Sequence, residues 1–306
     1  MMTRSSRLLA CAMLTVPGAG LAQDFTGAAT LGYAYSSVSG FRPNVNGFSL
    51  DGAGTFAFQS GFSLDVDGSL LHANPDRGGN AGVFDVGGQL NYRFLSGPLV
   101  GAYLEYASLD SNGLLGSDIN ATSYGVTGGY EGSLLQATAF FGGTDASTML
   151  GASSDWTDYG VNVAYTPTQY TKFAGHWMRS DIDTIFAETK VTSIGVGGDH
   201  DFGAGFTGFG AISHLNFDAR NIDATSYGFG VGYDLSQIAR VPAQVSLELA
   251  RTKIDPVGPD TDVDTIRFGV TIPLGARSGG APLNSAASSA MSPRHNALST
   301  FYDNLY

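Results

Sequence analysis

Apolar and polar residues alternate along most of this chain with a period of two. Between residues 124 and 130, for example, Tyr124, Val126, Gly128 and Tyr130 alternate with Gly or small polar residues. Such alternation is typical of a β-strand that faces an apolar environment on one side and water on the other. The pattern predicts about fourteen strands of roughly 10–14 residues each. They lie near 25–38, 47–58, 61–71, 83–94, 98–108, 119–131, 133–144, 155–165, 169–180, 188–202, 205–217, 222–235, 242–253 and 262–274.

The connections between these strands alternate in length. Those after even-numbered strands are short, at 59–60, 95–97, 132, 166–168, 203–204 and, somewhat longer, 236–241. Those after odd-numbered strands are longer and polar, including 39–46, 73–82, 109–118, 145–154 and 254–261. Short turns at one end and long loops at the other are the arrangement of an up-and-down barrel that spans a membrane. An even number of strands places the start of the first strand and the end of the last strand on the short-turn, periplasmic side.

A repeat supports the pairing of strands into hairpins. One glycine recurs about every 33–41 residues in the strand that leads to a short turn, as expected if a hairpin is the repeating unit. These glycines are Gly52, Gly87, Gly125, Gly160, Gly195, Gly228 and Gly269. Most of these strands also end in an aromatic residue, which predicts an interfacial girdle at the short-turn rim. The girdle residues are Phe58, Tyr92, Tyr130, Tyr165, Phe202 and Tyr233. A soluble β-sandwich would not need aromatic residues gathered at one end of its strands.

Composition narrows the class of protein further. Only 14% of the 306 residues are charged, whereas 43 are Gly and 33 are Phe or Tyr (19 and 14). A soluble domain carries about 25% charged residues, so half-apolar strands that face lipid explain the mixture better. The formal net charge of −12 argues against a nucleic-acid partner.

The first residues are predicted to be a targeting segment. Arg4 and Arg7 precede a short apolar stretch at 8–16, and small residues stand before Gln23. This is the pattern of a secretory signal peptide, which we predict to cover 1–22. Its removal takes away Cys11, the one cysteine of the chain. An exported chain without disulfides needs another source of stability, and a closed barrel supplies it by leaving no strand edge unpaired.

With these features the chain resembles the bacterial outer-membrane β-barrel proteins of the porin type, over about residues 23–274. The segment Arg267-x-Gly269-x-x-Ile272-x-Leu274 looks like the terminal-strand signal by which such barrels are recognised for assembly. The resemblance implies a transmembrane antiparallel up-and-down barrel of about 14 strands (12–16) covering 23–275. It also implies location in the outer membrane, contact with lipid and lipopolysaccharide, and handling by the barrel-assembly machinery.

A tail, residues 276–306, departs from that family pattern, in which the signal usually ends the chain. The tail is rich in Ser, Ala and Gly and shows little alternation before residue 298. Its composition fits a disordered periplasmic extension. The alternative is a segment that folds back into the lumen as a plug, anchored by Phe301, Tyr302 and Tyr306.

If the aromatic and Val positions face lipid, the residues of opposite parity face the lumen. The charged members of this set are Asp65, Asp67, Asp85, Arg93, Glu105, Glu131, Asp158, Lys172, Asp199, Glu248 and Arg267. The excess of carboxylates would concentrate cations at the wall. Solvated wall residues without any effect on selectivity are the alternative.

No arrangement of residues points clearly to catalysis, a cofactor or a metal. Asp199-His200-Asp201 and the pair Asp65 and Asp67 superficially resemble the site of omptin-type barrel proteases, but they are predicted to lie away from the long-loop rim. The triplet Asp260-x-Asp262-x-Asp264 lacks the Gly and Glu of a calcium loop. We therefore predict that the protein is not an enzyme and has neither a cofactor nor a metal.

The sequence thus predicts a porin-like channel for passive diffusion of small hydrophilic solutes, weakly cation-preferring. The alternative is a non-conducting outer-membrane barrel with a structural or adhesive role, or else a barrel hydrolase. All predicted loops have about ten residues or fewer, which favours a monomer over a trimer with an inward-folding loop.

Overall fold

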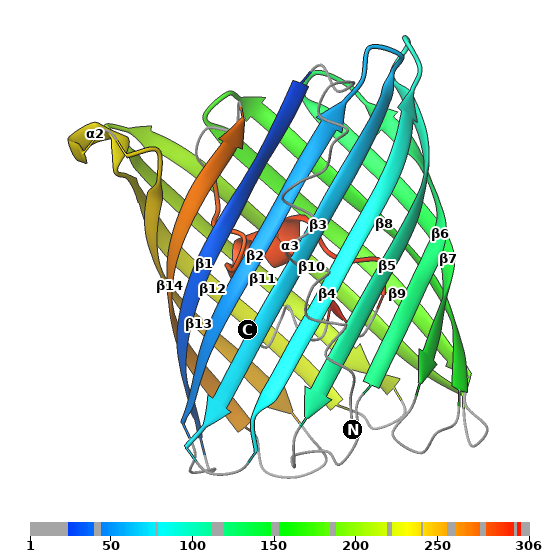
Figure 1. Ribbon diagram of the computed structural model, residues 1–306. Helices are drawn as coiled ribbons and strands as arrows, with labels where there is room; N and C mark the ends of the chain where they lie inside the picture. The colour runs from blue at the N-terminus through cyan, green and yellow to red at the C-terminus, as the bar shows by residue number, and fades with distance from the viewer. Residues whose placement is uncertain are drawn as a thin grey trace, which may run out of the picture.

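The computed structural model is a closed barrel of antiparallel strands in which every strand pairs with its neighbours in chain order and β1 closes on β14 (Figure 1). The strands are β1 (Asp24–Val38), β2 (Val45–Ala57), β3 (Phe62–Pro75), β4 (Ala81–Arg93), β5 (Pro98–Ser111), β6 (Ile119–Glu131), β7 (Leu135–Ser147), β8 (Ser153–Thr168), β9 (Thr171–Asp183), β10 (Glu188–Gly203), β11 (Phe206–Phe217), β12 (Ile222–Asp234), β13 (Gln244–Asp255) and β14 (Thr261–Gly275). The described residues also form the short helices α2 (Ser236–Ala239) and α3 (Ala286–Met291).

The structure describes residues 24–39, 44–76, 79–111, 119–147, 153–183, 188–218, 222–239, 241–255, 261–275, 280–296 and 299–300. The predicted signal peptide and the predicted tail anchors Phe301, Tyr302 and Tyr306 lie outside these residues. In the described part of the chain, neither helix is long and apolar enough to cross a membrane.

Closure of the barrel depends on the register of its first and last strands. Gly32 of β1 lies opposite Gly269 of β14 on one side and opposite Ser49 of β2 on the other. A closed ring satisfies the backbone hydrogen bonds between strands without leaving an edge in lipid. The prediction of fourteen antiparallel strands is therefore confirmed. The structure adds α2, which the sequence did not predict, in the longest of the short connections.

The two faces of the wall differ as the alternation predicts. The outward face carries exposed apolar side chains, which is the surface that a barrel presents to lipid. Examples are Leu31, Phe48, Leu104, Val126, Phe141, Ile194, Phe229 and Ile266. On the inward face, small polar residues of neighbouring strands are joined by hydrogen bonds. Thr144 Oγ1, for instance, donates to Asp158 Oδ2 at 2.6 Å between β7 and β8.

The tail returns into the barrel after β14. Figure 1 shows α3 enclosed by the strands, and it contacts the inner faces of β9, β10, β11 and β12. The sequence left two alternatives for the tail, a periplasmic extension and a segment folded back into the lumen. The described tail residues, 280–296 and 299–300, lie in the lumen.

Candidate functional site

The tail enters the lumen along β1, β13 and β14. The backbone N–H of Leu283 donates to Thr30 Oγ1 at 3.2 Å, and the backbone N–H of Ala286 donates to Glu248 Oε1 at 3.0 Å. The other oxygen of Glu248 accepts from Arg267 Nη1 at 2.8 Å, and both side chains are buried. One wall carboxylate thus holds both a wall guanidinium and the first turn of α3.

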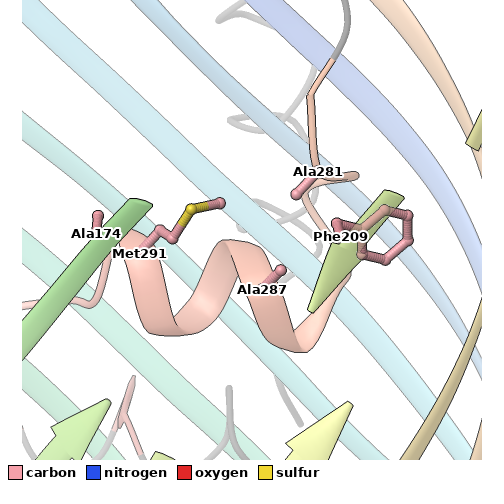
Figure 2. Close-up of a cluster of buried hydrophobic side chains, with 5 residues drawn as sticks. All are labelled: Ala174, Phe209, Ala281, Ala287 and Met291. Carbon is pink, nitrogen blue, oxygen red and sulfur yellow. The ribbon is translucent and has the colours of Figure 1, made fainter. Parts of the chain in front are cut away.

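The helix α3 packs its small apolar side chains against the wall. Ala287 and Met291 form a buried cluster with Ala281 of the tail and with Phe209 and Ala174 of the wall (Figure 2). Burial of apolar surface is the main favourable term for such contacts, and Ala side chains let the helix approach the strands closely.

Wall side chains bind the end of α3. The backbone carbonyl of Ala290 lies 2.8 Å from His176 Nδ1, and Asn162 Nδ2 donates to the carbonyl of Met291 at 3.2 Å. The last carbonyl groups of a helix have no hydrogen-bond partner within the helix, and these two wall side chains supply the partners here. At the other end, Ser285 caps the helix by accepting from the backbone N–H of Ser288 at 3.1 Å.

Beyond α3, the tail crosses to the opposite wall through Arg294. Its guanidinium forms ion pairs with Asp67 of β3 and Asp85 of β4. Ser69 also donates to Asp85. The Asp85 side chain is 7% exposed and that of Arg294 is 11% exposed, whereas Asp67 is 42% exposed. The pair with Asp85 is therefore the buried one, and loss of one partner of a buried pair leaves the other charge uncompensated.

His295 and Asn296 bind the next wall strand. His295 Nδ1 lies 2.8 Å from Glu105 Oε1, and Asn296 Nδ2 donates to Glu105 Oε2 at 3.2 Å. The imidazole stacks on Tyr103 with ring centres 4.0 Å apart and meets the edge of Phe140 at 4.7 Å. Farther along the tail, Thr300 Oγ1 lies 3.1 Å from Met178 Sδ on β9. The described tail thus contacts both halves of the wall.

Wall glycines make room for this path. An ideal Cβ at Gly87 would lie 2.7 Å from Arg294 Nη1, and one at Gly197 would lie 3.1 Å from the carbonyl oxygen of Ala287. Both positions are therefore sterically matched to the tail. The recurring glycine Gly52 differs, because a Cβ there would meet no atom within 4 Å.

A cavity of about 550 Å³ lies between the tail and the short-turn end of the barrel. Polar wall residues surround it, including Asp65, Asn91 and Lys172, and the tail residues 291–293 and 295 border it. Near the rim, Arg93 and Glu131 form an exposed ion pair at 2.9 Å.

The structure brings part of the predicted lumen set together. Asp67, Asp85, Glu105 and Glu248 contact the tail, and Arg267 pairs with one of them. Asp158 forms its hydrogen bonds within the wall and none with the described tail. It is fully buried within the wall, where it accepts from Thr144 and Ser180. Asp199 lies near the short-turn end of β10, opposite Lys172 of β9.

The predicted girdle residues lie at the short-turn end of the barrel. Tyr130, Tyr165 and Phe202 are exposed, by 50%, 46% and 71%. Tyr92 packs against Phe62, and Tyr233 against Phe206, with ring centres 4.8 Å apart and tilted ring planes in each pair. Phe58 follows the end of β2 and borders the cavity. The assembly-signal residues Gly269, Ile272 and Leu274 lie in β14, and their predicted role stays a prediction.

The candidate catalytic groups do not converge. His200 Nδ1 lies 2.8 Å from Thr171 Oγ1, and Asp201 accepts from the backbone of Gly203 in the short turn. Alternation places His200 on the face opposite Asp199 and Asp201. Within the described residues, no group of three or more His, Cys, Asp or Glu could hold a metal ion. The prediction that the protein is not an enzyme stays a prediction.

Sequence reasoning missed the residues of the tail that contact the wall. Arg294 and His295 are adjacent in a stretch, 278–302, that otherwise has no charged residue or His. That isolated basic pair, set against an acidic lumen wall, is the signal that could have indicated a docked tail.

A closed antiparallel barrel with an apolar belt outside and a largely polar interior has the architecture of a transmembrane β-barrel, and similar solved structures have this fold. They include the monoaromatic hydrocarbon channel CymD (10% identity, 89% of this chain and 94% of that chain, TM-score 0.54). An anion-selective porin from Comamonas acidovorans is also similar (12% identity, 82% and 98%, TM-score 0.52), as is a FadL homologue of Pseudomonas aeruginosa (8%, 82% and 90%, TM-score 0.50). No protein-family model and no curated protein matches the chain. These likenesses confirm the predicted fold class.

Proposed function

We propose that the protein is an outer-membrane channel for small solutes whose lumen is closed by its own tail. The observation that carries this proposal is the path of the tail, which contacts wall carboxylates on β3, β4, β5 and β13. Polar and ionic contacts of this kind exchange for contacts with water more readily than a large apolar core does. The tail can therefore leave the lumen while the hydrogen-bonded barrel stays closed.

The charge of the open channel follows from the same contacts. With the tail docked, Arg294 and His295 lie against Asp67, Asp85 and Glu105. When the tail leaves, these three carboxylates face water without those partners. A lumen lined by carboxylates attracts cations, so we expect weak cation preference in the open state.

Planar-bilayer recording of the refolded protein tests the proposal. We expect the full chain to be closed most of the time, and a chain truncated after Gly275 to conduct steadily with a reversal potential that indicates cation preference. Absence of conductance from both proteins, once both are shown to fold, would refute the channel and favour a structural or adhesive barrel. Anion preference would refute the electrostatic part alone. The monomeric state and the contacts with lipid, lipopolysaccharide and the assembly machinery stay predictions.

A further inference from the structure

The inner wall changes character toward the long-loop end. There the inward positions carry apolar side chains, although a wall that faces a water-filled lumen is usually polar. We name this set the collar. It comprises Leu71, Val83, Leu109, Ile119, Trp156, Ile182, Val191, Leu215, Phe217, Ala224, Ile254 and Val263.

The strand register makes the collar continuous over long arcs of the wall. Val83 lies opposite both Leu71 and Leu109, and Ala224 lies opposite both Leu215 and Ile254. On the second arc, Val191, Leu215 and Ala224 form one buried apolar cluster. This cluster is distinct from the one around α3, because its described members all come from strands.

A small cavity of about 60 Å³ lies where the collar meets the tail. Leu71 and Val83 of the collar border it, and so do the carboxylates of Asp51 and Asp85. On β4, Val83 and Asp85 are two residues apart and share one face, so an apolar group and a carboxylate are about 7 Å apart along the strand. The tail residues Leu283, Asn284 and Ser289 form the other side.

The charges around this cavity are unequal. Four carboxylates, those of Asp51, Asp67, Asp85 and Glu248, stand against the guanidinium groups of Arg267 and Arg294 among the described residues of this region. Arg267 is matched by Glu248, and Arg294 by Asp85 with Asp67. Asp51 accepts a hydrogen bond from Ser49 at 2.8 Å and forms no ion pair with any described residue. Arg267 itself borders the cavity but pairs with Glu248, so the region has two more carboxylates than guanidinium groups and can accept a further positive group beside Asp51.

We propose that this cavity and the collar beside it bind a small organic cation, an amine or guanidinium carried on an apolar or aromatic body. The cationic group would lie against Asp51 and Asp85, and the body against Leu71 and Val83. Arg294 of the tail shows that this part of the wall binds a guanidinium group, because it already forms an ion pair with Asp85. A cation too large for the cavity would compete with the tail for this wall.

This inference rests on the proposed channel function, since it names the class of solute that the lumen would take from the long-loop side. Its test measures binding directly. The full chain in detergent micelles is titrated calorimetrically with phenethylamine, 2-phenylethanol or phenylacetate, and protein-free micelles correct for partitioning. These three probes share one aromatic body and carry a positive, zero or negative charge.

We expect saturable binding of phenethylamine, binding of 2-phenylethanol at least about tenfold weaker because a charge-assisted hydrogen bond is lost, and none of phenylacetate. Asp51→Asn should weaken the amine about tenfold and leave the alcohol unchanged. Val83→Thr should weaken both the amine and the alcohol, because it adds a hydroxyl to the collar at nearly constant shape. Val86→Thr, on the outer face of the same strand, should change neither.

Equal binding of the amine and the alcohol would overturn the inference, as would an Asp51→Asn variant that folds and binds phenethylamine normally. Conductance recorded from the same preparations separates the two proposals. Conductance without saturable amine binding refutes the cation site and leaves the channel. Amine binding with the expected variant effects, but without conductance, supports the site and refutes the channel.

Discussion

Replacing Arg294 with Gln should release the tail from the lumen. The substitution removes the countercharge of Asp85, whose side chain is 7% exposed, and of Asp67, which is 42% exposed. Breaking a buried ion pair costs about 3–5 kcal/mol, whereas a half-exposed pair contributes about 0–1 kcal/mol. Because Ser69 still donates to Asp85, we take the lower end, about 3 kcal/mol. At about 1.4 kcal/mol per factor of ten, the ratio of docked to released tail falls roughly a hundredfold.

Single-channel recording measures this ratio as the fraction of time spent closed. The matched control is Arg251→Gln, which makes the same chemical change in an exposed pair with Asp264 on the outer face of the barrel. We expect the control to record like the unaltered protein. Equal closed fractions for Arg294→Gln and the unaltered protein, with both correctly folded, would refute the idea that these ion pairs hold the tail.

Three further predictions concern other contacts of the lumen. Glu248→Gln removes the carboxylate that pairs with the buried Arg267 guanidinium, so it should lower the free energy of unfolding in urea by about 3–5 kcal/mol. The control Glu131→Gln, in the exposed pair at the rim, should change this free energy by less than about 1 kcal/mol. The hydroxyl of Tyr103 is buried and has no hydrogen-bond partner among the described residues, so Tyr103→Phe should raise that free energy by about 1 kcal/mol. A lower free energy of unfolding in the variant would contradict this expectation. Gly197→Leu should push the α3 backbone away from the wall, because a Cβ at this position would lie 3.1 Å from the carbonyl oxygen of Ala287. The tail should then be cleaved more readily by protease, and unchanged sensitivity would contradict that packing.

The barrel could be predicted because its signal is local. Alternation of side chains along one strand reports which face meets lipid, so each strand can be recognised without knowledge of its neighbours. Closure followed from an even strand count and from the connection lengths. The helix α2 was missed because its four residues, Ser236–Ala239, are too few to show a helical period.

The docked tail could not be derived in the same way. Arg294 pairs with Asp85 across 209 residues of sequence, and no periodic pattern links two such positions. A Ser-, Ala- and Gly-rich stretch has the composition of a disordered segment, whereas its described residues, 280–296 and 299–300, follow a path set by the wall that they contact. The collar was missed for a different reason. Residues such as Val83 and Leu215 occupy inward positions that the alternation rule assigns to polar side chains, so the rule predicted their orientation but not their chemistry.

The closing register of β1 against β14 has a consequence for how current through the channel should look. A strand pair cannot open within lipid without leaving its backbone N–H and C=O groups without hydrogen-bond partners. The barrel therefore keeps a fixed circumference. The diameter of the lumen cannot increase gradually. Any change in conductance must come from what occupies the bore, and recordings should step between discrete levels rather than drift.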